Sequence, residues 1–218
     1  MLVKKFFISE EKIRVIHNGI KITKICNHKK YKKDTPKFII GFIGRLDPHK
    51  GVHVLISAMQ KLKDKNIKLI IAGDGVLTHF LKKKASTLNN VKFIGRVASP
   101  YEFMQLIDLL VVPSIREPLG NVCLEAGLCK VPVLASNVDG IPEVIKNKVT
   151  GELIDATDNI LVDFPEGVVP LPEVVVNPEM QSLETPKQIN PTLLAKKILE
   201  LSESPEVLFQ YSNKLHKK

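Results

Sequence analysis

The chain has 218 residues, of which 44% are hydrophobic and 25% are charged, values typical of a globular domain. No apolar run approaches the roughly 20 residues that a membrane-spanning helix requires, so none is predicted. The net charge is +9, and all of this excess falls within residues 1–50, which hold 13 basic and 4 acidic residues.

The basic N-terminal part bears on location and partners. Residues 1–20 do not have the pattern of a signal peptide, because Lys4 and Lys5 interrupt a short apolar start, so a cytoplasmic location is expected. The basic segment 28–33 can contact anionic lipid at the inner face of the membrane, or it can be a solvated loop. No nucleic-acid-binding motif accompanies the charge, so nucleic acid is not expected as a partner.

Apolar runs and helix-period segments alternate between residues 37 and 154. The apolar runs predict five strands, at residues 38–44, 68–72, 91–94, 108–112 and 131–135. The segments between them space their apolar residues as one face of a helix does. Short connections and regular alternation predict an α/β fold with a doubly wound, Rossmann-like parallel sheet. Ligands of such sheets bind at the carboxyl ends of the strands.

Two segments depart from this alternation. Residues 1–36 show no clean period. Residues 157–190 contain five prolines and little regularity, which predicts an irregular insertion. Directly after it, Pro191 is well placed to begin a helix that Asn190 caps.

The segment after the first strand carries the first candidate site. Residues 44–51 read Gly-Arg-Leu-Asp-Pro-His-Lys-Gly and open a helix. Free amides and the helix dipole attract anions, and Arg45 and Lys50 add full charges, so a diphosphate would suit this segment. An ordinary turn with surface cations fits equally well. The spacing matches neither a P-loop nor G-x-G-x-x-G.

A second cluster follows the fourth strand. Glu117 lies in the loop, Gly120 begins a helix, and Glu125 lies more than one turn inside it. The helix N-terminus offers amides to phosphate, and the carboxylates can accept hydrogen bonds from sugar hydroxyls. The alternative is that Glu117 complements the helix dipole and Glu125 faces solvent. The apolar neighbours of Glu125 argue against that alternative.

Two weaker clusters lie at other strand ends. Residues 93–97, Phe-Ile-Gly-Arg-Val, end the third strand, where the backbone could contact a base or form a plain turn. Residues 138–143, Val-Asp-Gly-Ile-Pro-Glu, together with Thr150-Gly151, would alone be only a loop and a helix start.

Taken in order, these clusters resemble the C-terminal domain of family 4 glycosyltransferases, which is one half of the GT-B fold. The resemblance covers about residues 38–155. Its pieces are Gly-Arg-Leu-x-x-x-Lys-Gly at 44–51, Ala-Gly-Asp-Gly at 72–75, Phe-x-Gly at 93–95, Pro-Ser at 113–114, two glutamates at 117 and 125, Gly-Ile-Pro-Glu-Val at 140–144, and Thr-Gly at 150–151. Residues 15–20 resemble the interdomain linker of that family.

The resemblance implies a reaction and a set of residues. The reaction would be retaining transfer of a sugar from a nucleotide diphosphate sugar to a glycolipid or polysaccharide precursor, with no bound metal and no other cofactor. Arg45 and Lys50 would hold the diphosphate and stabilise the leaving nucleotide, and Glu117 would bind the donor sugar. The remaining donor-binding residues would be Gly44, Leu119 and Gly120 at the phosphates, Glu125 at the ribose, and Arg96 and Val97 at the base.

The resemblance also implies a domain organisation. Residues 1–36 would be the remnant of an N-terminal domain and a linker, and residues 37–218 would form the donor-binding domain, with 157–190 inserted. Activity would then need an acceptor domain, and a split gene product, a truncated reading frame and a partner-dependent enzyme are the options. Two alternatives stay open: a non-catalytic nucleotide-sugar-binding module or truncated relic, and a dinucleotide-binding oxidoreductase domain. The missing G-x-G-x-x-G motif weakens the second.

Overall fold

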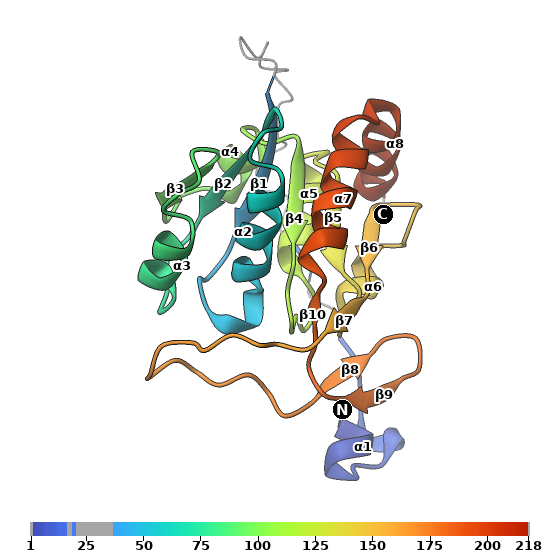
Figure 1. Ribbon diagram of the computed structural model, residues 1–218. Coiled ribbons are helices and arrows are strands. Elements are labelled where there is room, and N and C mark those ends of the chain that lie inside the picture. The colour runs from blue at the N-terminus through green and yellow to red at the C-terminus, as the bar shows by residue number, and fades with distance from the viewer. Residues whose placement is uncertain (1, 17–18, 21–36, 218) are drawn as a thin grey trace.

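A six-stranded parallel sheet forms the centre of the protein (Figure 1). The computed structural model describes residues 2–16, 19–20 and 37–217. The strands lie in the order β3-β2-β1-β4-β5-β6. They are β1 (Phe38–Ile43), β2 (Ile67–Ala72), β3 (Val91–Gly95), β4 (Leu109–Val112), β5 (Val133–Ser136) and β6 (Glu152–Ile154). This confirms the predicted doubly wound sheet and adds β6, a sixth strand that the sequence did not indicate.

Helices cover both faces of the sheet. On one face, α2 (Val52–Lys61), α3 (Thr78–Lys84) and α7 (Pro191–Ser202) pack against the alternate strand residues that form the larger apolar cluster. On the other face lie α4 (Pro100–Met104), α5 (Asn121–Leu128) and α6 (Ile141–Val144). Because both faces are covered, β4 and β5 are buried along their whole length, which explains their continuous apolar sequences.

Two helices at the C-terminal end support this arrangement. The Asn190 side chain accepts hydrogen bonds from the backbone N–H groups of Thr192 and Leu193, which confirms it as the N-cap of α7. The sequence analysis did not identify α8 (Pro205–His216). This helix packs on α5 at Gly127, where an added Cβ would lie 3.0 Å from the Leu215 side chain. It thereby holds α5 against the sheet.

The segment predicted to be an irregular insertion contains short strands. Most of residues 157–190 is loop, but β7 (Ala156–Asp158) pairs with β10 (Gln188–Ile189), and β8 (Val175–Asn177) pairs with β9 (Ser182–Glu184), both antiparallel. Prolines and the brevity of these strands hide their pattern in the sequence. In Figure 1 the β8–β9 hairpin lies beyond the carboxyl ends of the central strands, beside α1 (Leu2–Phe6).

Some features of the N-terminal part fall outside the described residues. The basic segment 28–33 does so entirely, as do residues 17–18 of the predicted linker. A short 3-10 helix, η1 (Glu10–Lys12), follows α1, and Val15 and Ile16 are exposed. Among the described residues, no helix combines the length and apolar character that crossing a bilayer requires.

A buried histidine joins α2 to residues 157–190, and this predicts a pH dependence of stability. His53 is 2% exposed, its Nε2 lies 2.9 Å from Oε1 of Gln188, and its ring packs edge-on against Phe164. Burial lowers the pKa of His53 to about 4. In the unfolded chain His53 has a pKa of about 6.5, so below that pH the unfolded chain binds a proton that the folded chain does not. The free energy of unfolding therefore falls by up to about 3 kcal/mol as the pH drops from about 6.5 to 4.

We expect His53→Gln, which cannot titrate, to lose less stability than the wild type between pH 7 and pH 4.5. Urea unfolding of both proteins at the two pH values measures the difference. An equal loss in the two proteins would show that His53 does not carry this pH dependence.

Candidate functional site

A cleft of about 510 Å³ lies at the carboxyl ends of the central strands. Parallel neighbours β1 and β4 end at the same edge of the sheet, so the loops that follow them face each other there. The cleft brings together seven of the nine residues predicted from the sequence. They are Gly44, Arg45, Lys50, Glu117, Leu119, Gly120 and Glu125.

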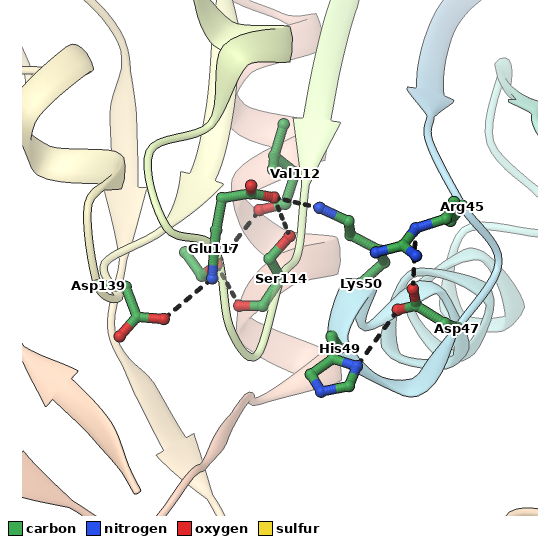
Figure 2. A network of polar contacts seen from close by, with 9 residues as sticks. Arg45, Asp47, His49, Lys50, Val112, Ser114, Glu117 and Asp139 are labelled. Atoms are coloured by element: carbon green, nitrogen blue, oxygen red, sulfur yellow. Dashed lines mark hydrogen bonds and ion pairs between the residues drawn. The ribbon is translucent and has the colours of Figure 1, made fainter. Parts of the chain in front are cut away.

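A lysine and a glutamate form the central contact of the cleft (Figure 2). Lys50 Nζ lies 2.6 Å from Glu117 Oε2, although 67 positions separate the two residues. The Ser114 hydroxyl donates a longer bond, 3.3 Å, to the same oxygen. Glu117 is only 8% exposed, so the contact with Lys50 offsets part of the cost of removing its carboxylate from water. Within the described part of the chain, Glu117 Oε1 has no hydrogen-bond partner and is therefore available to a hydroxyl donor.

A glycine allows the lysine to reach the glutamate. Lys50 ends the 3-10 helix η2 (Pro48–Lys50), and Gly51 follows with a φ of 62°. A Cβ on Gly51 would lie 1.9 Å from the carbonyl oxygen of Pro113, so only glycine fits between α2 and the loop after β4. The backbone N–H of Ile115 also donates to the carbonyl of His49, at 2.7 Å. The two loops are thus joined by backbone contacts that leave Lys50 beside Glu117.

Arg45 lies at the rim of the cleft. Its side chain is 84% exposed, and its Nε lies 3.5 Å from Asp47 Oδ2. Such a contact contributes little in the absence of ligand, because water screens it. The guanidinium is therefore free to turn toward an anion in the cleft, whereas Lys50 already points into it.

The N-terminus of α5 forms the opposite wall. Gly120 caps the helix with a φ of 85°, a conformation that disfavours other residues. In the described structure, the backbone N–H groups of Leu119 and Gly120 have no hydrogen-bond partner. Unpaired amides at a helix start favour an anion. Glu125, one turn further on, also lines the cleft, and burial raises the pKa of its carboxyl.

Arg96 and Val97 are the two predicted residues that do not line the cleft. They follow β3, and two strands, β2 and β1, lie between β3 and β4 in the sheet. The Arg96 side chain is exposed, and its Nε lies 3.8 Å from Asp74 Oδ2. Hydrogen bonds from the Thr78 hydroxyl and the Gly75 amide hold the pKa of Asp74 below its usual value. Arg96 therefore pairs with a carboxylate of the neighbouring loop.

Two supporting residues were given no role by the sequence analysis, although both lie in motifs that it singled out. Ser114 contacts the Glu117 carboxylate, and Asp139 accepts a hydrogen bond from the Glu117 backbone N–H at 3.0 Å. A polar residue directly before Gly140, at the end of a strand, was the signal available for Asp139. Among the described residues, no group of three or more His, Cys, Asp or Glu side chains is arranged to hold a metal ion.

Comparison with known proteins shows what the chain as a whole is similar to. The family model described as "Glycosyl transferases group 1" matches residues 24–161. An uncharacterized glycosyltransferase of Methanocaldococcus jannaschii is 34% identical over an alignment of 163 positions, which covers 67% of this chain and 42% of that protein. The capsular polysaccharide biosynthesis glycosyltransferase CapM of Staphylococcus aureus is 32% identical over an alignment of 165 positions, which covers 68% of this chain and 43% of CapM. The chain thus spans less than half the length of these relatives.

A solved structure has a fold similar to that of this chain. Anabaena HepE in complex with UDP-glucose matches with a TM-score of 0.63 and 25% identity, covering 84% of this chain and 43% of HepE. Together with the observed sheet, this likeness confirms the predicted Rossmann-like half of a GT-B fold.

Proposed function

The chain belongs to the group 1 glycosyltransferase family, and we propose that it binds the nucleotide diphosphate sugar donor of a retaining glycosyltransferase. The observation that carries the proposal is the Lys50–Glu117 pair, 2.6 Å apart in a cleft that the N-terminus of α5 also lines. A cation, unpaired amides and a carboxylate are the groups that a sugar attached to a diphosphate requires.

The diphosphate would lie between the two loops. The amides of Leu119 and Gly120 would bind its oxygens, with Lys50 and Arg45 adding full charges and Gly44 admitting the ligand close to the backbone. When the bond between the sugar and the diphosphate breaks, negative charge grows on the leaving nucleotide. Fixed cations that face this charge lower the activation barrier of the transfer, as a bound metal ion does in other enzymes. We therefore propose that this transfer needs no metal or other cofactor.

The two glutamates would divide the rest of the donor. Glu117 Oε1 is available to accept a hydrogen bond from a sugar hydroxyl, and Glu125 would accept from the ribose. The base would lie toward the end of β3, where Arg96 and Val97 follow the strand. UDP and UDP-glucose are the first ligands to test, because solved structures of HepE contain them.

The acceptor and the surroundings of the enzyme are also proposals. CapM acts in capsular polysaccharide biosynthesis by its name, which supports a glycolipid or polysaccharide precursor as acceptor. We propose that an acceptor-binding domain completes the site, because the described residues form the donor half of a GT-B fold. Contact of the basic segment 28–33 with an anionic membrane surface would bring the cytoplasmic enzyme to a lipid acceptor.

The division between the glutamates predicts that their substitutions affect UDP-glucose similarly but UDP differently. Glu125→Ala should weaken UDP and UDP-glucose alike, by about 10-fold or more, because each loses one charge-assisted hydrogen bond. Glu117→Ala should weaken UDP-glucose by a similar factor. It should leave UDP affinity unchanged or higher, since Lys50 is freed for the diphosphate. Calorimetry with both ligands measures the four ratios. Equal effects of both substitutions on UDP would refute the division.

A further inference from the structure

Asp139 joins the loop that carries Glu117 to the β8–β9 hairpin. Its Oδ2 accepts a hydrogen bond from the backbone N–H of Glu117 at 3.0 Å, as Figure 2 shows. Its Oδ1 accepts a bond from the backbone N–H of Val176, in β8, at 2.9 Å. One carboxylate thus uses both oxygens to bridge two segments that lie 59 positions apart in the sequence.

Backbone contacts on either side reinforce this bridge. The N–H of Asp139 donates to the carbonyl of Val176 at 3.2 Å, and the N–H of Gly140 donates to the carbonyl of Glu117 at 3.1 Å. A Cβ on Gly140 would lie 2.0 Å from the carbonyl oxygen of Pro118, so the two loops are in direct backbone contact. The loop after β4, the loop after β5 and the hairpin are therefore joined at one point.

The backbone of Asp139 indicates that its side chain is important there. Asp139 has a φ of 45°, in the left-handed region that glycine adopts readily and other residues adopt at a cost. A glycine at this position would avoid the cost, but it would have no carboxylate. In this chain the left-handed conformation occurs together with two charge-assisted hydrogen bonds to the carboxylate, each stronger than a neutral one.

We propose that Asp139 is a positioning residue for Glu117, and that the β8–β9 hairpin acts through it on the contact between Glu117 and the donor sugar. The proposal rests on the donor-binding function proposed above. Lys50 and Ser114 hold the Glu117 side chain at its carboxylate, and Asp139 holds the same residue at its amide. Fixing both ends directs Oε1 toward the cleft.

The substitution Asp139→Asn tests this role with little change in shape. Asparagine is well tolerated in the left-handed region, but it offers one oxygen and an NH₂ group in place of two oxygens, so one of the two N–H groups loses its acceptor. We expect UDP-glucose to bind about 3- to 10-fold more weakly while UDP affinity stays unchanged, a size typical of coupling between neighbouring residues. Hydrogen exchange of the Glu117 or Val176 amide should also become faster.

Asp155→Asn is the matched control. Asp155 borders the same hairpin region and accepts a bond from Asn137 Nδ2 at 2.9 Å, but it does not line the donor cleft. This variant should keep the wild-type ratio of UDP to UDP-glucose affinity.

A double-mutant cycle separates positioning from general support of the fold. In a Glu117→Ala background, Asp139→Asn should cause no further change in the ratio, because the group through which it acts is gone. A full further loss in that background, or an unchanged ratio in the single variant, would overturn the positioning role. A wild type that binds neither ligand would instead overturn the proposed function, and the role of Asp139 in donor binding with it.

Discussion

Transfer of sugar to an acceptor is expected only when this chain is combined with an acceptor-binding domain. The described cleft supplies groups for a donor, but it lies open at the edge of one sheet. Orienting two reactants against each other supplies about 7–11 kcal/mol of barrier reduction, and a domain that holds one reactant cannot provide it. The chain alone should therefore show slow hydrolysis of the donor, because the leaving nucleotide is still stabilised, and no transfer.

A radiolabelled-donor assay with membrane extract as the source of acceptor measures this effect. It is run with the chain alone and with an acceptor-domain partner, and Lys50→Ala in both arms reports background from the extract. Transfer that requires both the partner and Lys50 is the expected result. Strong transfer by the chain alone would show that residues 1–36 or 157–190 build an acceptor site.

Lys50→Ala is expected to have the largest effect of any single substitution in the cleft. It removes a charge from the diphosphate site, and it leaves the nearly buried Glu117 carboxylate without its cation. Removing one partner of a buried ion pair costs about 3 kcal/mol or more, and a lost charge-assisted contact with ligand costs about 1.5–3 kcal/mol. The variant should thus unfold at lower urea concentration and bind nucleoside diphosphate at least about 10-fold more weakly.

Two further variants separate these effects. Lys61→Ala removes an exposed lysine from the end of the adjoining helix α2 and should change neither property. The double variant Lys50→Met with Glu117→Gln removes both charges, so it should recover stability but not diphosphate affinity. Recovery of affinity in the double variant would mean that Lys50 acts only by neutralising Glu117.

The candidate residues that follow the strands could be predicted from the sequence because local patterns determine where each strand ends and the next helix begins. The continuous apolar run of β1 and the turn that starts at Gly44 are local, and so is the start of α5 at Gly120. These patterns placed seven site residues at one edge of the sheet. The pairing of Lys50 with Glu117 is not local, because it depends on β1 lying next to β4. The sequence alone therefore indicated seven of the residues that line the cleft but not the ion pair at its centre.

The features that the sequence did not reveal depend on distant contacts. β6 has three residues, and its Glu152 is buried. The Tyr211 hydroxyl donates to the Glu152 carboxylate at 2.8 Å, and Lys197 Nζ lies 3.3 Å from it, so both partners stabilise the buried charge. No periodicity predicts a buried glutamate whose partners lie on α7 and α8. Likewise, the role of Asp139 depends on Val176, in a hairpin of two three-residue strands.

Calorimetry of the 218-residue chain with UDP, UMP and NAD tests the donor-binding claim most directly, with the GDP and GMP pair as a second series. The cleft presents Lys50, Arg45 and the amides at the start of α5 to a second phosphate that a monophosphate lacks. We predict that a nucleoside diphosphate binds at least about 10-fold more tightly than its monophosphate, as expected for one added charge-assisted contact. We also predict that the preference disappears in Lys50→Ala. Equal affinity for the diphosphate and monophosphate, or binding of NAD in preference to both, would contradict the account.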